Sequence, residues 1–225
     1  MTWIKICGTT NLEDALTAVE AGADAIGFVF YEKSPRKIDA ESARKIAATL
    51  PKNIEKVGVF VDTDCAGIRS TVAEAGLTAV QLHGKVSMDS VWQEQRSPFE
   101  TVGASKLIPM IPGDTLQDGG IFMSDRVREK TFAILIDSQV NGASGGSGAT
   151  FDWEAARGMV QVLSVRVPVI VAGGLTPSNV AKAMRIFQPF GVDVASGVEA
   201  SPGKKDPDKV RAFVKAVRDI DGKAS

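Results

Sequence analysis

Two residues with complementary acid–base chemistry close two apolar stretches of the sequence. Cys7 ends residues 3–7, and Asp137 ends residues 132–137. If both stretches are barrel strands, both side chains point into the barrel mouth, where a thiol and a carboxyl can act as base and acid on one substrate. Spacing alone leaves Cys7 open between this role and that of a small buried apolar residue. Asp137 needs a partner or a task, because aspartate is rarely buried without one.

A thiol is a useful base when its pKa is lowered, and a helix that begins just after Cys7 would help. Thr10 and Glu13 have the spacing of a capping box, so we expect that helix to begin at Thr10. Cys65 opens a second predicted helix and is expected to be inert. Two cysteines are too few for a disulfide framework, which favours a reducing cytoplasm.

Glycine-rich turns follow two further apolar stretches. Gly173 and Gly174 come after residues 167–172, and Ser196 and Gly197 come after residues 192–195. Glycine lets backbone N–H groups approach an anion closely, and barrels often build a phosphate site from the loops after their last two strands. The alternative is that these glycines only make tight turns. We expect a phosphate site.

Other candidates have simpler alternatives. Arg36 either binds a carboxylate through two parallel hydrogen bonds or belongs to a solvated basic loop. His83, the single histidine, is either catalytic or a hydrogen-bonded structural residue. No second His or Cys stands near it in sequence, so no metal site is expected. Asp62 is a further carboxylate at the mouth, interpreted as solvated or structural.

A long loop, residues 138–150, follows Asp137. It exceeds the usual strand-to-helix connection and is rich in glycine and serine. We interpret it as a lid that closes over a bound ligand and excludes water; the alternative is a plain surface loop. The residues expected to form the lid are Gly145, Gly146, Ser147 and Gly148.

Eight apolar stretches alternate with helical patterns along the chain. This alternation predicts an α/β fold, a single-domain (β/α)8 TIM barrel over residues 1–225, rather than an open doubly wound sheet, because candidate functional residues follow nearly every strand. Residues 109–130 have no clear assignment. The predicted strands are 3–7, 25–30, 56–61, 79–82, one within 101–108, 132–137, 167–172 and 192–195. The predicted helices are 10–21, 40–50, 64–75, about 86–95, 152–164, about 176–187 and about 206–219.

The composition excludes several classes of partner. A net charge of -1 without a basic stripe disfavours nucleic acid. There is no run of eighteen apolar residues, so no membrane span is expected. The first residues lead directly into a strand, so we expect no signal segment and a cytoplasmic location.

The ordered set of motifs resembles the phosphoribosylanthranilate isomerase family of tryptophan biosynthesis. Ser147 stands where threonine is common in that family, and residues 109–130 match no motif of it. The stretches that carry the resemblance are 5–8, 34–36, 80–84, 135–138, 145–148, 151–153, 172–175, 196–199 and 202–206.

The resemblance implies an Amadori rearrangement of N-(5-phosphoribosyl)anthranilate to the 1-deoxyribulose 5-phosphate derivative, with no cofactor. Cys7 would be the general base, Asp137 the general acid, and Arg36 the group that holds the anthranilate carboxylate. Gln81 and His83 lie in a matching motif and would contact substrate. The partner is then a phosphorylated small molecule, and monomer and homodimer both fit.

Two rivals stay open at this point. The histidine-pathway isomerase catalyses the same rearrangement on another aminoaldose, typically with aspartate at the place of Cys7. A non-catalytic phosphosugar-binding barrel would need neither Cys7 nor Asp137.

Overall fold

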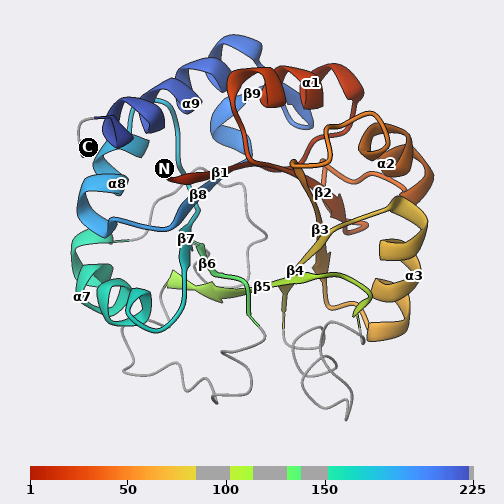
Figure 1. Ribbon diagram of the computed structural model, residues 1–225, viewed down its shortest axis with the longest axis horizontal. Helices are drawn as coiled ribbons and strands as arrows, with labels where there is room; N and C mark the ends of the chain where they lie inside the picture. The colour runs from red at the N-terminus through yellow and green to blue at the C-terminus, as the bar shows by residue number, and fades with distance from the viewer. Residues whose placement is uncertain (85–101, 114–130, 138–151, 223–225) are drawn as a thin grey trace.

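The structure is a computed structural model, and it describes residues 1–84, 102–113, 131–137 and 152–222. Eight parallel strands close into a barrel in the order β1 to β8, with helices around the outside (Figure 1). The predicted (β/α)8 barrel is confirmed, and the open sheet is excluded because β1 pairs with both β2 and β8. The expectation of one domain over residues 1–225 stays a prediction. The strands are β1 (Trp3–Ile6), β2 (Ala25–Phe30), β3 (Glu55–Val61), β4 (Ala79–His83), β5 (Lys106–Pro112), β6 (Ile134–Asp137), β7 (Val169–Val171) and β8 (Gly191–Val194).

Six α-helices of the described residues pack against the outer face of this barrel. They are α1 (Leu12–Ala21), α2 (Ala40–Ala47), α3 (Cys65–Ala75), α7 (Trp153–Ser164), α8 (Val180–Phe187) and α9 (Pro207–Asp221). Short polar caps set where they begin: the Asp39, Asp64 and Asp152 side chains each accept a backbone N–H of the first turn. The helix expected near 86–95 and the lid residues Gly145, Gly146, Ser147 and Gly148 lie outside the described residues.

Two helix starts differ from the prediction. Asn11, and not Thr10, caps α1: its side chain accepts the Asp14 N–H and donates to the Asp14 carboxylate. Thr10 is engaged elsewhere, since its hydroxyl donates to the Gly203 carbonyl at 2.7 Å. The helix expected from about residue 176 begins at Val180, because Asn179 accepts the Thr176 N–H and holds the preceding residues in a turn.

The fifth strand lies later in the sequence than predicted. It was expected within 101–108, but β5 spans Lys106–Pro112 and pairs with β4 and β6. Pro109 and Pro112 lie inside this strand. A proline lacks the N–H, but its fixed φ is compatible with extended backbone, so the strand continues through it.

Side chains alternate between the barrel interior and the helix-facing side, as strand geometry requires. The helix-facing set forms the main hydrophobic core and includes Ile4, Phe28, Phe60 and Leu82, all 1% exposed or less. The interior set holds a second apolar layer with Ala25, Val57, Ala79, Ile108 and Leu135. Toward the carboxyl ends of the strands, polar interior residues such as Gln81 and Asp193 lie beside a small apolar cluster of Cys7, Val29 and Val59, and this mixed layer marks the site.

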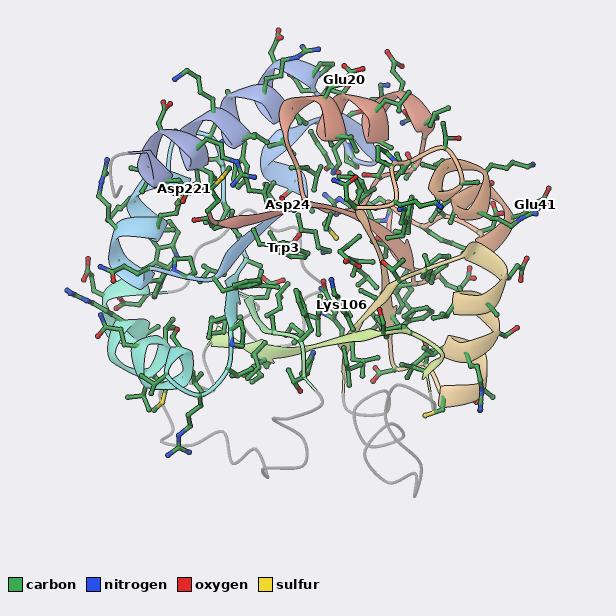
Figure 2. The ribbon with its side chains drawn as sticks, viewed as in Figure 1. Trp3, Glu20, Asp24, Glu41, Lys106 and Asp221 are labelled. Carbon is green, nitrogen blue, oxygen red and sulfur yellow. The ribbon has the colours of Figure 1, made fainter. Side chains whose placement is uncertain are left out.

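The opposite end of the barrel is closed by aromatic side chains. Trp3 packs on Phe132 and Phe190 at centroid distances of 6.0 and 6.3 Å. The Lys106 ammonium lies 4.7 Å from the centre of the Phe132 ring, and Figure 2 shows Trp3 and Lys106 toward the middle of the barrel. This end is therefore a plug, and the open end lies at the carboxyl ends of the strands.

Two features join the end of the chain to its beginning. Arg218 on α9 donates to the Thr2 carbonyl and pairs with Asp24 and Asp221, which Figure 2 shows near the β1 end. After β8, a short 3-10 turn (Ser196–Val198) leads into a hairpin of β9 (Glu199–Ser201) and β10 (Lys204–Lys205). This hairpin reaches back to α1, because the Lys205 N–H donates to the Asp14 carboxylate at 2.8 Å.

Candidate active site

One pocket of about 340 Å³ lies at the carboxyl ends of the strands. It brings together residues that are far apart in the sequence, as expected for a barrel mouth. Eight of the predicted site residues line it: Cys7, Arg36, Gln81, His83, Asp137, Gly173, Gly174 and Ser196. Gly197 does not line it, because its backbone packs against the Leu175 carbonyl.

Cys7 lies one residue beyond the end of β1 and is 7% exposed. Its N–H donates to the Val194 carbonyl at 2.8 Å, which continues the pairing of β1 with β8 and fixes the backbone at the thiol. Burial raises the pKa of the Cys7 thiol above its ordinary value, and nearby Asp193 adds to the rise. The lowered pKa to which the start of α1 was expected to contribute is therefore wrong, since withdrawal from water outweighs the positive charges nearby.

A buried ion pair lies beneath Cys7 inside the barrel. Lys5 is fully buried, and its ammonium donates to the Asp193 carboxylate at 3.0 Å. Burial alone would lower the pKa of Lys5, but Asp193 and Cys7 outweigh it and raise the pKa, so Lys5 stays charged. The pair therefore places a fixed positive charge close to the thiol.

Asp137 ends β6 and lines the pocket opposite the β1 side. It stands beside Pro112 of β5 in the sheet register, and its side chain is partly exposed. The prediction that Cys7 and Asp137 share one mouth is confirmed, because both line the same pocket. A substrate in this pocket can touch a thiol and a carboxyl that come from well-separated strands.

Arg36 is buried and does not belong to a solvated loop. Its Nε and Nη2 donate to the two carboxylate oxygens of Glu199, each at 2.8 Å. The hydrogen bonds to Glu199 outweigh burial and raise the pKa of Arg36. Because Glu199 takes the Nε–Nη2 edge of the guanidinium, the Nη1–Nη2 edge keeps donors for a second carboxylate.

Lys205 joins this pair to the backbone under the thiol. Its ammonium donates to the carbonyls of Cys7 and Ala195 at 2.6 and 3.1 Å, and to Glu199 at 3.0 Å. Burial raises the pKa of Glu199, but Arg36 and Lys205 outweigh this and lower it, so the carboxylate stays ionised. The hairpin after β8 thus holds both Arg36 and the carbonyl of Cys7.

The glycine turn after β7 and Ser196 after β8 line the pocket. Gly173 and Gly174 have φ of 83° and 62°, a left-handed conformation that glycine adopts without strain. Among the hydrogen bonds of the described residues, none has the N–H of Gly173, Gly174 or Ser196 as donor. Asn179 braces the turn by donating to the Gly174 carbonyl at 2.9 Å. N–H donors from three residues that line one pocket suit a phosphate group.

Gln81 and His83 form a pair on β4. The Gln81 side-chain nitrogen lies 2.6 Å from His83 Nε2, so the imidazole accepts there as a neutral ring. Withdrawal of the ring from water, with Lys5 nearby, lowers the pKa of His83 to about 3. Gln81 is 2% exposed, and its side-chain oxygen has no partner among the described residues. That oxygen is an acceptor available to a ligand.

Sequence reasoning did not assign a role to Lys5, Asp193, Glu199 or Lys205. The sequence does single out Lys5 and Asp193, because each is the only charged residue of an otherwise apolar strand and its side chain faces the barrel interior. In the part of the chain that the structure describes, no cluster of His, Cys, Asp or Glu is arranged to hold a metal ion. Within that same part, no helix has the length and apolarity needed to cross a membrane.

The fold and the pocket place the chain among (β/α)8-barrel enzymes, whose active sites lie at this end of the barrel. The family model described as N-(5'phosphoribosyl)anthranilate (PRA) isomerase matches residues 4–216. The N-(5'-phosphoribosyl)anthranilate isomerase of Geotalea uraniireducens (strain Rf4) is 42% identical over 221 residues, 98% of this chain and 100% of that protein. The chain belongs to this family of tryptophan biosynthesis and is an isomerase.

Two solved structures resemble the chain over nearly its whole length. One shows monomers generated from the dimeric isomerase of Thermotoga maritima, with a TM-score of 0.76 and 37% identity over 97% of this chain and 100% of that one. The other shows phosphoribosyl anthranilate isomerase in complex with reduced 1-(o-carboxyphenylamino)-1-deoxyribulose 5-phosphate. Its TM-score is 0.74, with 37% identity and the same coverage.

Proposed function

We propose that the chain converts N-(5'-phosphoribosyl)anthranilate to 1-(2-carboxyphenylamino)-1-deoxyribulose 5-phosphate, with Cys7 as base and Asp137 as acid. The observation that carries the proposal is the single pocket that Cys7, Asp137 and the glycine turns share. A related isomerase holds a reduced form of this product, which has a phosphate at one end and a carboxylate at the other. The pocket offers complementary groups to both ends.

The two ends of the substrate would be held by different parts of the barrel. The phosphate accepts from the N–H groups of Gly173, Gly174 and Ser196, which have no acceptor among the described residues. The anthranilate carboxylate accepts from the Nη1–Nη2 edge of Arg36, whose other edge Glu199 holds. Fixing both ends aligns the ribose between Cys7 and Asp137 and removes much of the entropic cost of reaction.

The reaction then needs two proton transfers from named groups. Asp137 gives a proton to the ribose ring oxygen, the bond from that oxygen to C1′ breaks, and the anthranilate nitrogen forms an iminium with C1′. The Cys7 thiolate takes the proton from C2′, and the electron pair of that C–H bond forms the C1′–C2′ double bond. The enolamine tautomerises to the ketone, so the aldose becomes a ketose with no external electron donor.

Gln81 and His83 complete the wall on the β4 side. The Gln81 side-chain oxygen is a buried acceptor and can take a hydrogen bond from a ribose hydroxyl or from the anthranilate N–H. The low pKa of His83, about 3, keeps its ring neutral, so we assign it no acid role at neutral pH. Gln81 and His83 are therefore proposed as substrate-binding residues.

Three further expectations complete the proposal. Residues 145–148 would close over the bound substrate as a lid. The chain would act in the cytoplasm and use no cofactor. It would work as a monomer or a homodimer.

A turnover assay with two substrates tests the function. Phosphoribosylanthranilate is generated in situ, purified protein is added, and the loss of substrate fluorescence is followed. The histidine-pathway aminoaldose runs in parallel. Rapid loss of fluorescence supports the proposal. Turnover of the histidine-pathway compound alone would assign the sister reaction, and binding without any turnover would leave a phosphosugar-binding barrel.

A further inference from the structure

The mechanism above gives no role to the ammonium of Lys5, a buried charge close to Cys7. Its side chain is fully buried inside the barrel on β1. A buried lysine is costly, because the ammonium gives up its hydration. A buried ion pair often adds little stability compared with apolar residues of the same size. The position therefore calls for a reason beyond stability of the fold.

The sheet geometry aims Lys5 at the thiol. Lys5 and Cys7 are two residues apart along extended backbone, so both side chains point into the barrel, one layer above the other. Asp193 is the partner of Lys5 in the register of β1 with β8, and its carboxylate accepts from the ammonium at 3.0 Å. That contact uses one of the three donors of the ammonium, which leaves donors for the layer above.

Gly27 on β2 provides the space in which the two side chains meet. A Cβ atom placed on Gly27 would lie 2.8 Å from the Cys7 sulfur and 3.0 Å from Lys5 Cε. The first distance is too short for a methyl group and the second is at the tight limit, so the thiol and the end of the lysine stem both lie against this glycine. Electrostatic attraction between Lys5 and Cys7 acts on both groups and opposes protonation of the thiolate.

We propose that Lys5 is a positioning residue for Cys7: its ammonium, held by Asp193, stabilises the thiolate that removes the C2′ proton. This role rests on the proposed function, in which Cys7 is the base. Lys5 neither gives nor takes a proton in the step. It remains an ammonium, while the thiolate becomes a thiol and the electron pair moves into the substrate.

Other charges also face the thiol and must be counted. From β10, Lys205 favours the thiolate, and from the loop after β2 Arg36 interacts with it favourably as well. Asp193 on β8 disfavours the thiolate, and Asp137 on β6 lines the same pocket. Lys5 is the strongest favourable influence on Cys7, so its removal should have a larger effect than the loss of Asp193.

The test measures the ionisation of the thiol without any substrate. The rate of Cys7 alkylation by iodoacetamide is followed against pH, with modification at Cys7 read from the mass of its peptide. The midpoint of this pH dependence reports the ionisation of the thiol, and in Lys5→Met we expect it to rise by about one pH unit or more. At a fixed pH below both midpoints, the rate then falls about tenfold. The pH–rate profile of turnover should move in the same direction.

A second variant keeps the test decisive if Lys5→Met fails to fold, since that change leaves the Asp193 carboxylate buried without its cation. The double variant Lys5→Met/Asp193→Asn removes both charges together. Its midpoint should still lie above that of the wild type, because the attraction by Lys5 exceeds the repulsion by Asp193. Its thermal stability should exceed that of Lys5→Met.

Lys56→Met is the matched control. Lys56 is another buried strand lysine, 6% exposed on β3, but its ammonium donates to the Pro51 carbonyl at 2.7 Å and it does not line the pocket. In Lys56→Met, the midpoint of Cys7 alkylation against pH should equal that of the wild type. A midpoint at or below the wild-type value in the double variant, or an equal rise in Lys56→Met, would overturn the proposal. Since alkylation needs no substrate, this result is independent of whether the isomerase reaction is the right one.

Discussion

Arg36→Met is the change whose effects on stability and on binding can be separated most clearly. Arg36 and Glu199 are both 8% exposed, and two hydrogen bonds of 2.8 Å join them. Methionine fills much of the volume of the arginine stem but has no donors. The variant therefore removes one half of a buried ion pair and, with it, the proposed clamp for the substrate carboxylate.

The loss of stability follows from the carboxylate that is left behind. Removing one partner of a buried pair costs about 3–5 kcal/mol. Glu199 keeps Lys205 at 3.0 Å, so we expect a loss near the lower end, about 3 kcal/mol. In Arg36→Met/Glu199→Gln the buried charge is gone, and part of this loss should return. Urea denaturation of the two variants and the wild type measures both values.

The loss of affinity follows from the free edge of the guanidinium. Two charge-assisted hydrogen bonds to the ligand carboxylate contribute about 1.5–3 kcal/mol each, so about a hundredfold loss of affinity is a conservative expectation. Calorimetry would compare the reduced product analogue with the same compound lacking its carboxylate. Only the first should lose affinity in Arg36→Met. An equal loss for both compounds would refute the clamp and leave Arg36 a purely structural role.

Three further outcomes are expected. Gly27→Ala places a methyl group against the Cys7 sulfur and Lys5 Cε, so kcat should fall by at least about tenfold while the affinity for the reduced product analogue is kept; a wild-type kcat would contradict this packing. The pKa of the Cys7 thiol is raised by burial, so kcat/KM should increase with pH through the neutral range, and a flat profile would speak against a thiolate base. The pKa of His83 is lowered from 6.5 to about 3, so between these pH values only the unfolded state takes up a proton on the imidazole. The free energy of unfolding of the wild type should therefore fall by about 1.4 kcal/mol for each pH unit below about 6.5, in addition to any fall that His83→Asn shows. Because the chain has one histidine, its imidazole NMR signal should show no titration near neutral pH, and a midpoint near 6.5 would show the assignment to be wrong.

The strand pattern made the barrel predictable from the sequence. Apolar runs bounded by glycine and polar residues gave seven of the eight strands nearly at their observed positions. The fifth was misplaced because Pro109 and Pro112 obscured it, although proline is compatible with an extended strand. The α1 cap was misassigned by one residue because Thr10 and Asn11 are both good caps; in the structure Asn11 accepts the Asp14 N–H while Thr10 donates to Gly203.

The site was predictable where its residues end strands. Cys7, Asp137 and the turn at Gly173 and Gly174 all follow strands, and the fold places the carboxyl ends of parallel strands together. The direction of the Cys7 pKa was not predictable, because it depends on burial and on charges distant in the sequence. Asp193 is 186 residues from Cys7 in the chain, yet it faces the thiol through the pairing of β1 with β8.

The supporting charges could not be predicted for a related reason. Arg36 is a basic loop residue in the sequence, and a solvated loop was the simpler interpretation. Its burial depends on Glu199, which is 163 positions away and is carried by a hairpin too short to be recognised from its pattern. Lys205 connects that hairpin to the Cys7 carbonyl. Such a network is specified by the closed barrel and not by local propensity.

The most direct test of the account compares turnover and binding in Cys7→Ser and Asp137→Asn. Both substitutions keep the size of the side chain and remove the proton-transfer function. We predict that kcat falls by about 10²–10⁴ in each, while the reduced product analogue binds as it does to the wild type. Substantial turnover in either variant would contradict the acid–base assignment. Loss of analogue binding in folded Cys7→Ser would give the thiol a binding role instead of a catalytic one.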